Sequence, residues 1–144
     1  MRAVHQAIDV AATPDECWRV FSDLSTWTSW FPLLKSVRPL DDDPWRVGGR
    51  LRLALQVAFA RMPIVVEIEE LAPGRRVRWV GGSLGVRGNH AYDLDVRSPG
   101  LTRFTSHEEF TGAGSALMRP LHRFLDGEAH KSMARFKAMV ETKR

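Results

Sequence analysis

The chain has 144 residues, of which 44% are hydrophobic and 26% are charged, and 21 basic against 17 acidic residues give a net charge of +4. This length fits one domain over residues 1–144 with a single core, and the composition is that of a folded protein rather than a disordered one. No segment approaches the roughly 18 apolar residues of a membrane span. The first residues lack the apolar core of a secretory signal, so we expect a cytoplasmic protein without stable membrane insertion.

The basic residues are dispersed among acidic ones. If Pro73 and Gly74 form a two-residue turn, Glu69 falls opposite Arg78 on the outer face of a hairpin, as an ordinary cross-strand ion pair. Nucleic-acid interfaces instead combine a basic stripe with exposed aromatic side chains. We therefore expect no nucleic-acid binding.

The N-terminal residues predict a strand followed by two short helices. Ala3–Val10 alternates like a strand, and Thr13–Glu16 reads as an N-cap, a proline at the first helical position and a capping-box glutamate. This helix should end near Ser22, and a second one should cover Ser25–Trp30. The single cysteine, Cys17, excludes an internal disulfide and is expected to be a small buried side chain of the first helix.

The middle of the chain predicts four more strands. They cover about Leu34–Leu40, Arg46–Ala58, Met62–Leu71 and Arg75–Gly82, with Gly48 and Gly49 as a bulge and Gly81–Gly88 as a glycine-rich link. Alternation directs one side chain in two toward the core. Leu53, Leu55, Val66 and Trp79 are among the residues expected to point inward.

The last third predicts a hairpin and a long helix. Gly88–Val96 and Leu101–Phe110 are strands joined at Ser98-Pro99-Gly100, and their pairing places His90 opposite Glu108. Tyr92, Phe104 and Ser106 share that face. Because an unpaired buried polar group costs about 1 to 3 kcal/mol, a mixed face of this kind indicates a pocket rather than a packed core.

The helix should run from about Ser115 to Thr142. Apolar residues at three- and four-residue spacing, Met133 among them, form its inner stripe, and Pro120 should either kink the helix or mark its true start.

This order of elements resembles the START-like or Bet v 1-like superfamily and, within it, the bacterial SRPBCC (polyketide cyclase/dehydrase) group. The resemblance rests on the segments Ala12–Trp18, Phe21–Asp23, Trp30–Pro32, Val47–Leu51, Pro73–Trp79, His90–Leu94, Thr102–Phe104 and Glu108–Gly112. It implies an α+β helix-grip fold, in which a curved seven-stranded antiparallel sheet with two short helices after its first strand wraps around a long C-terminal helix. Members of the superfamily bind lipids, sterols or hormones, cyclise or dehydrate polyketides, or serve as subunits of other machinery.

The first functional hypothesis is therefore the binding of a small, largely apolar, cyclic or aromatic molecule between the sheet and the C-terminal helix. The cavity should have a volume of roughly 300 to 1,000 Å³. The expected ligand-binding residues are Leu53, Leu55, Val66, Trp79, Phe104, Ser106, Trp30 and Met133. By the resemblance, Trp27 and Trp30 belong to short helices near the pocket mouth.

The alternative is an enzyme of the cyclase/dehydratase kind. His90 and Glu108 would form an acid/base pair, and Tyr92 would donate a hydrogen bond to a developing enolate. A third hypothesis is an accessory subunit with a packed core, an exposed apolar patch and no ligand. The sequence leaves the three open, together with the oligomeric state.

Two further sequence patterns predict neither a catalytic nucleophile nor a metal site. Gly81–Gly85 matches the G-x-S-x-G pattern, but the chain continues as a strand where a nucleophile elbow requires a helix. The histidines show neither an H-E-x-x-H spacing nor paired cysteines, so no metal and no cofactor are expected.

Overall fold

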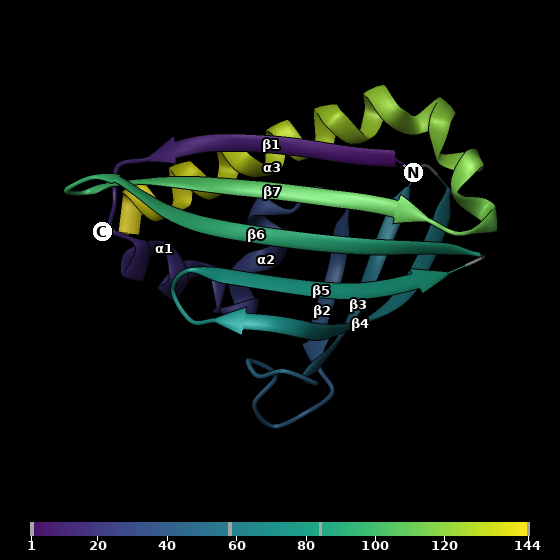
Figure 1. The fold of residues 1–144 in the computed structure, drawn as a ribbon, viewed down its shortest axis with the longest axis horizontal. Coiled ribbons are helices and arrows are strands. Elements are labelled where there is room, and N and C mark those ends of the chain that lie inside the picture. Colours follow the sequence, from purple (N-terminus) through teal and green to yellow (C-terminus); the bar gives the residue numbers. More distant parts are fainter. Residues whose placement is uncertain (1, 58, 84, 144) are drawn as a thin grey trace.

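Seven antiparallel strands form one curled sheet in the order β1-β7-β6-β5-β4-β3-β2. The computed structural model describes residues 2–57, 59–83 and 85–143. The strands are β1 (Arg2–Val10), β2 (Leu34–Pro39), β3 (Arg50–Val57), β4 (Ala60–Ala72), β5 (Arg76–Ser83), β6 (Val86–Ser98) and β7 (Leu101–Thr111). Strands adjacent in sequence are mostly adjacent in the sheet, and β1 closes the order beside β7 (Figure 1).

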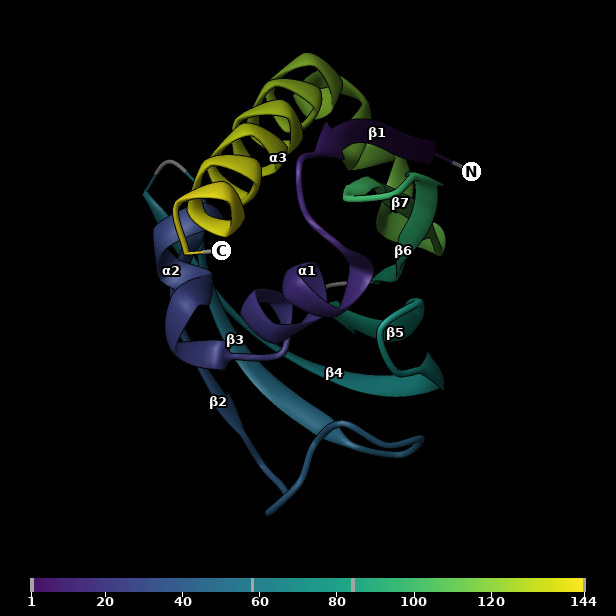
Figure 2. The same ribbon diagram turned by 90° about the vertical axis from the view of Figure 1, so that its left-hand side faces the viewer.

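The helices lie on the concave face of this sheet. They are α1 (Pro14–Phe21), the 3-10 helix η1 (Leu24–Thr26), α2 (Trp27–Trp30), the 3-10 helix η2 (Ala113–Leu121) and α3 (His122–Lys143). Figure 2 shows α3 crossing the open side of the curl while α1 lies inside it. This is the α+β helix-grip fold that the sequence predicts.

The start of α1 follows directly from its sequence. The backbone N–H of Glu16 donates to Thr13 Oγ1 at 3.2 Å, and the Thr13 N–H donates to Glu16 Oε1 at 2.9 Å, which is the expected capping box. The expected short helix over Ser25–Trp30 is present as η1 and α2. None of the helices within the described residues has the length and hydropathy of a membrane span.

The third strand begins at Arg50, so the predicted start at Arg46 is wrong. Residues 44–49 form a turn instead, in which the Gly49 N–H donates to the Arg46 carbonyl at 2.9 Å. A Cβ at Gly49 would lie 1.8 Å from the Pro44 carbonyl oxygen, so this turn requires glycine.

The β4–β5 hairpin keeps one predicted pair and changes another. Ile68 pairs with Trp79 as expected, but Arg78 pairs with Glu70 instead of Glu69. A register shift between Ile68 and Glu70 compensates for a turn one residue longer than predicted. The predicted glycine-rich link is also wrong, because β5 extends to Ser83 and β6 starts at Val86.

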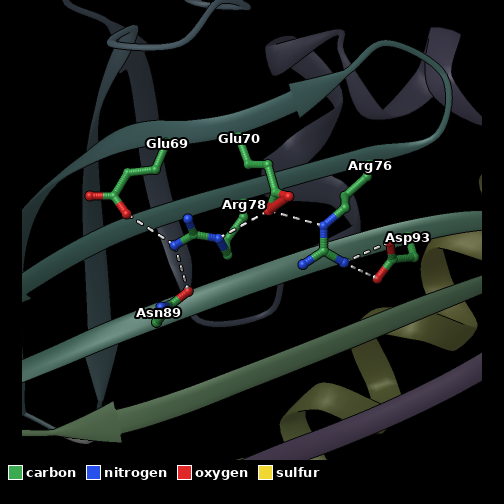
Figure 3. A network of polar contacts seen from close by, with 6 residues as sticks. All are labelled: Glu69, Glu70, Arg76, Arg78, Asn89 and Asp93. Carbon is green, nitrogen blue, oxygen red and sulfur yellow. Dashed lines mark hydrogen bonds and ion pairs between the residues drawn. The ribbon is translucent and has the colours of Figure 1, made fainter.

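The outer face of this hairpin carries an ion-pair network (Figure 3). Arg76 Nη1 lies 2.8 Å from both carboxylate oxygens of Asp93, and its Nε lies 3.2 Å from Glu70 Oε2. Arg78 bridges Glu70 at 3.2 Å and Glu69 at 3.0 Å. Hydrogen bonds from Arg76 and then Arg78 hold the pKa of Glu70 below its usual value. The network ties β4, β5 and β6 together on the convex side.

Phe21 occupies the centre of an aromatic cluster where α1 enters the curl. The cluster consists of Phe21, Trp27, Trp30, Trp79, Tyr92, Phe104 and Phe136, all 5% exposed or less. The Phe21 ring centroid lies 4.9 Å from that of Tyr92 and 6.3 Å from that of Trp79. We call this part of the concave face the closed end.

Coverage decreases toward the other end of the sheet. Met133, Phe136 and Val140 of α3 are buried, whereas Leu121, Leu125 and Ala129 are half-buried and Leu117 is 73% exposed. Pro120 lies in η2 and α3 begins two residues later, so this proline marks the start of the α-helix.

The strands show the same gradient. Leu53 and Val66 are buried, but their inward-facing neighbours Leu55 and Ile64 are half-buried. We call the region of Leu55, Ile64, Gly88, Glu108 and Leu125 the open end.

Candidate functional site

The β6–β7 pairing brings His90, Tyr92, Ser106 and Glu108 together on the concave face. His90 pairs with Glu108 and Tyr92 pairs with Ser106, as predicted. The alternate residues point outward, as expected for His107, whose Nδ1 lies 3.1 Å from His5 Nδ1. The predicted register of this hairpin is therefore confirmed.

The four side chains form one hydrogen-bonded chain. His90 Nε2 lies 2.7 Å from Ser106 Oγ, His90 Nδ1 lies 3.3 Å from Glu108 Oε2, and the Tyr92 hydroxyl is hydrogen-bonded to Ser106. An ionised carboxylate only accepts, so Nδ1–H of His90 donates to Glu108. In the neutral imidazole Nε2 then accepts from the Ser106 hydroxyl.

Tyr92 is the buried end of the chain. Its side chain is 5% exposed, and its ring stacks on His90 at 4.2 Å and on Phe104 at 5.4 Å between centroids. Desolvation, together with the nearby charge of Glu108, raises the pKa of Tyr92 far above its usual value. The phenol stays neutral over the whole physiological range.

Glu108 is the exposed end of the chain. Its side chain is 30% exposed, against 10% for His90. Gly88 lies beside it, and a Cβ built there would be 3.5 Å from Glu108 Oε2, an ordinary contact distance. Gly88 pairs with Gly81 on β5, where the side chains of Val66 and Ile64 fill the space that a Cβ would take, so Gly88 is the glycine of this pair that leaves room beside Glu108.

Sequence reasoning missed four residues of this site: Gly81, Gly88, Ile64 and Gln6. Gly88 lies two residues before His90 on the same strand, so it shares the inner face with His90. The glycine spacing instead predicts that Gly81–Gly88 is a loop that links two strands. Gln6 pairs with Ser106 from β1, whose partner strand the sequence pattern did not identify.

The order serine, histidine, glutamate is also that of a nucleophile triad. Ser106, however, is 8% exposed and lies in the middle of β7, paired with Gln6 on one side and Tyr92 on the other. Backbone N–H groups inside such a ladder are used by the neighbouring strands and cannot form an oxyanion hole. The arrangement orients Glu108 and offers no accessible nucleophile.

The residues expected to bind a ligand fall into two groups. Leu55 lies at the open end, and Ser106 belongs to the hydrogen-bonded chain. The others are buried side chains of the core: Leu53, Val66, Trp79, Phe104, Trp30 and Met133. The expected place of Trp27 and Trp30 at a pocket mouth is wrong, because both are at most 1% exposed, and the Trp30 indole donates to Thr26 Oγ1 at 3.1 Å.

The closed end has no cavity of the expected size. Within the described part of the chain, the space between α1 and the sheet that is lined by Trp18, Phe21, Val77, Tyr92, Leu94 and Phe104 cannot hold a water molecule. The prediction of roughly 300 to 1,000 Å³ of enclosed space is wrong here because Phe21 fills the curl. The polar side chains on the inner face satisfy one another, so their burial does not require a ligand. Partly exposed side chains of the inner face, Leu55, Ile64 and Glu108, lie at the open end instead.

Metal ligands do not converge at this site. Across residues 2–57, 59–83 and 85–143 no group of three or more histidine, cysteine or acidic side chains has the geometry to hold a metal ion. Cys17, expected to be buried, is 0% exposed, and burial raises the pKa of its thiol to about 11.

Solved structures share this architecture at low sequence identity. The protein TTHA0849 from Thermus thermophilus superposes with a TM-score of 0.80 and 14% identity, covering 99% of each chain. The Zhui aromatase/cyclase from Streptomyces sp. R1128 gives 0.77 and 18% identity, over 97% of this chain and 93% of its own. The di-domain ARO/CYC BexL of the BE-7585A biosynthetic pathway gives 0.76 and 19% identity, over 98% of this chain and 47% of its own.

These likenesses establish the fold. In sequence, no curated protein matches the chain. The family described as polyketide cyclase / dehydrase and lipid transport matches residues 1–141. The match covers nearly the whole chain, from β1 to the last turns of α3, and the chain therefore belongs to this family.

Proposed function

We propose that the chain binds a small, largely apolar, cyclic molecule at the open end, between the inner face of the sheet and the first turns of α3. The observation that carries the proposal is the exposure of Glu108. A chain of polar side chains leads out of the core and ends in this 30% exposed carboxylate, near the half-buried apolar side chains of the open end. Half-buried Leu55, Ile64 and Leu125 would supply the apolar contacts.

The family supports a ligand-binding or cyclase-type role, and two of the similar structures are named as aromatase/cyclases. Those names describe the other proteins and leave the ligand of this chain open. The closed end argues for a short ligand, since Phe21 and its aromatic neighbours already fill it.

The direct test is to block the open end. Gly88→Val places a side chain beside Glu108 on the inner face, where a Cβ meets only ordinary contacts, and valine suits a strand. Arg87→Val, on the exposed outer face of the same strand, is the matched control. Binding of naphthalene-sized compounds is measured by titration calorimetry, with thermal unfolding to confirm the fold.

We expect the wild type and Arg87→Val to bind alike and Gly88→Val to lose at least about 10-fold in affinity, with folding retained. If no compound of a varied apolar panel binds the wild type, the proposal fails, and the accessory-subunit alternative is left. Unchanged affinity in Gly88→Val would place the ligand elsewhere on the protein.

An enzymatic role at the same site is the second candidate, and the His90–Glu108 pair at 3.3 Å favours it. Here Glu108 would be the base, because it is the exposed member of the pair, and His90 would orient it. Tyr92 is only 5% exposed and stacks on His90 inside the core, so its burial does not favour its expected part as donor to an enolate. Should an activity be found, Glu108→Gln should lower kcat by about 10²-fold or more while binding persists.

A further inference from the structure

We infer that the polar group of the ligand is a hydrogen-bond donor, a ring hydroxyl or an amine, and that Glu108 selects it over ring carboxylates and ethers. This inference rests on the proposed function and assigns the ligand chemistry of that site. It follows from the exposure of the Glu108 carboxylate and from the burial of the other polar groups on the inner face.

The other polar groups of the chain are buried against one another. His90 Nε2 lies 2.7 Å from Ser106 Oγ, His90 Nδ1 lies 3.3 Å from Glu108 Oε2, and Tyr92 is hydrogen-bonded to Ser106. Each of these groups is at most 10% exposed. The chain therefore presents no N–H or O–H to a molecule at the open end.

Glu108 is the exposed member of the chain, and an ionised carboxylate only accepts hydrogen bonds. A carboxylate has about four lone-pair sites, and His90 engages Oε2. The remaining lone pairs are available at a side chain that is 30% exposed. A ligand that donates a hydrogen bond completes the chain, whereas a carboxylate brings a second negative charge beside Glu108 and an ether brings a second acceptor.

The test uses three compounds that share one ring system: 2-naphthol, 2-methoxynaphthalene and 2-naphthoate. A hydrogen bond to an ionised group corresponds to about 10- to 100-fold in affinity. We expect 2-naphthol to bind at least about 10-fold more tightly than either of the others, by titration calorimetry at pH 7.

Glu108→Gln gives the decisive comparison. With His90 still donating from Nδ1, the glutamine carbonyl accepts from His90 and its NH₂ group turns toward the ligand. The acceptor 2-methoxynaphthalene should then gain relative to 2-naphthol, so that the preference falls by about 10-fold or more or is inverted. Glu109→Gln, the neighbouring carboxylate on the outer face, should leave the preference unchanged.

The possible results distinguish a failure of the donor preference from a failure of the proposed binding function. Equal binding of all three compounds, lost in Gly88→Val, would overturn the donor preference and leave the binding function standing. A preference for 2-naphthol that survives Glu108→Gln would also overturn it. Failure of all three to bind would overturn both.

Discussion

His90 and Glu108 face each other across β6 and β7 with 3.3 Å between Nδ1 and Oε2, while the adjacent residues His107 and Glu109 form a pair at 3.0 Å on the opposite face. The same two residue types thus occur once in the concave site and once on the outer surface of the same strands. The outer pair lacks a serine and a tyrosine behind it. It offers a matched control for each change to the inner pair.

Ser106→Ala should destabilise the protein by about 1 to 3 kcal/mol, because it leaves His90 Nε2 and the Tyr92 hydroxyl buried without their partner. Urea unfolding measures the change, and Ser36→Ala, an exposed serine of β2, should have almost no effect. A loss equal to that of the Ser36 control would show that the chain contributes nothing to stability.

Phe21→Ala should cost about 3 to 5 kcal/mol, since the Phe21 ring packs against Tyr92, Trp79 and Phe136 at the closed end. The cavity it leaves is apolar and should bind benzene, which raises the melting temperature of the variant alone. Phe59→Ala is the control, because Phe59 is fully exposed at 104% and its removal should change stability by less than about 0.5 kcal/mol. Similar losses in the two variants would contradict the packing described.

Cys17 should react slowly with thiol reagents in the native protein and rapidly in urea. Burial raises the pKa of its thiol from 9.0 to about 11, so the native thiol stays protonated at pH 8. A raised pKa contributes stability that is complete below the unfolded value and is lost as the pH rises from about 9 to 11. Wild type and Cys17→Ala should therefore converge in stability over that interval, and divergence there would exclude the linkage.

Arg76→Met should lower stability by about 0.5 to 1 kcal/mol at pH 7, because the ion pairs are partly exposed. The pKa of Glu70 is lowered by hydrogen bonds from Arg76 and Arg78, so this contribution is present above about pH 4.5 and is lost as the pH falls through the pKa of Glu70. The gap between wild type and variant should shrink in acid and in high salt. Arg75→Met, at an exposed neighbour, should show neither dependence.

The sequence predicted the elements that depend on local chemistry. The capping box at Thr13 and the alternation around Ser98-Pro99 determine α1 and the His90–Glu108 register without help from the rest of the fold. The β4–β5 hairpin shows the limit of such reasoning. A bulge at Glu69 and a turn longer than predicted shift the register in opposite directions. The predicted Ile68–Trp79 pair was therefore confirmed, although the predicted two-residue turn was wrong.

The cavity could not be judged from the strands alone. Whether a mixed inner face lines a pocket depends on what the helices place against it, and Phe21 reaches Tyr92 only because α1 enters the curl of the sheet. The hydrogen bonds among His90, Ser106 and Glu108 likewise depend on rotamers that the register permits but does not determine. The open end arises because the start of the C-terminal helix is exposed. The apolar residues of this helix are evenly spaced along its whole length, so the sequence did not predict that exposure.

The filled closed end leaves no passage between α1 and the sheet, so the proposed site has a single opening. A ligand would enter and leave by this one opening. A bound molecule would therefore have to dissociate before the next one could bind. Depth is limited by the aromatic floor around Phe21, and a long acyl tail would therefore protrude past the rim formed by the β3–β4 turn and η2, where Phe59 and Leu117 are exposed.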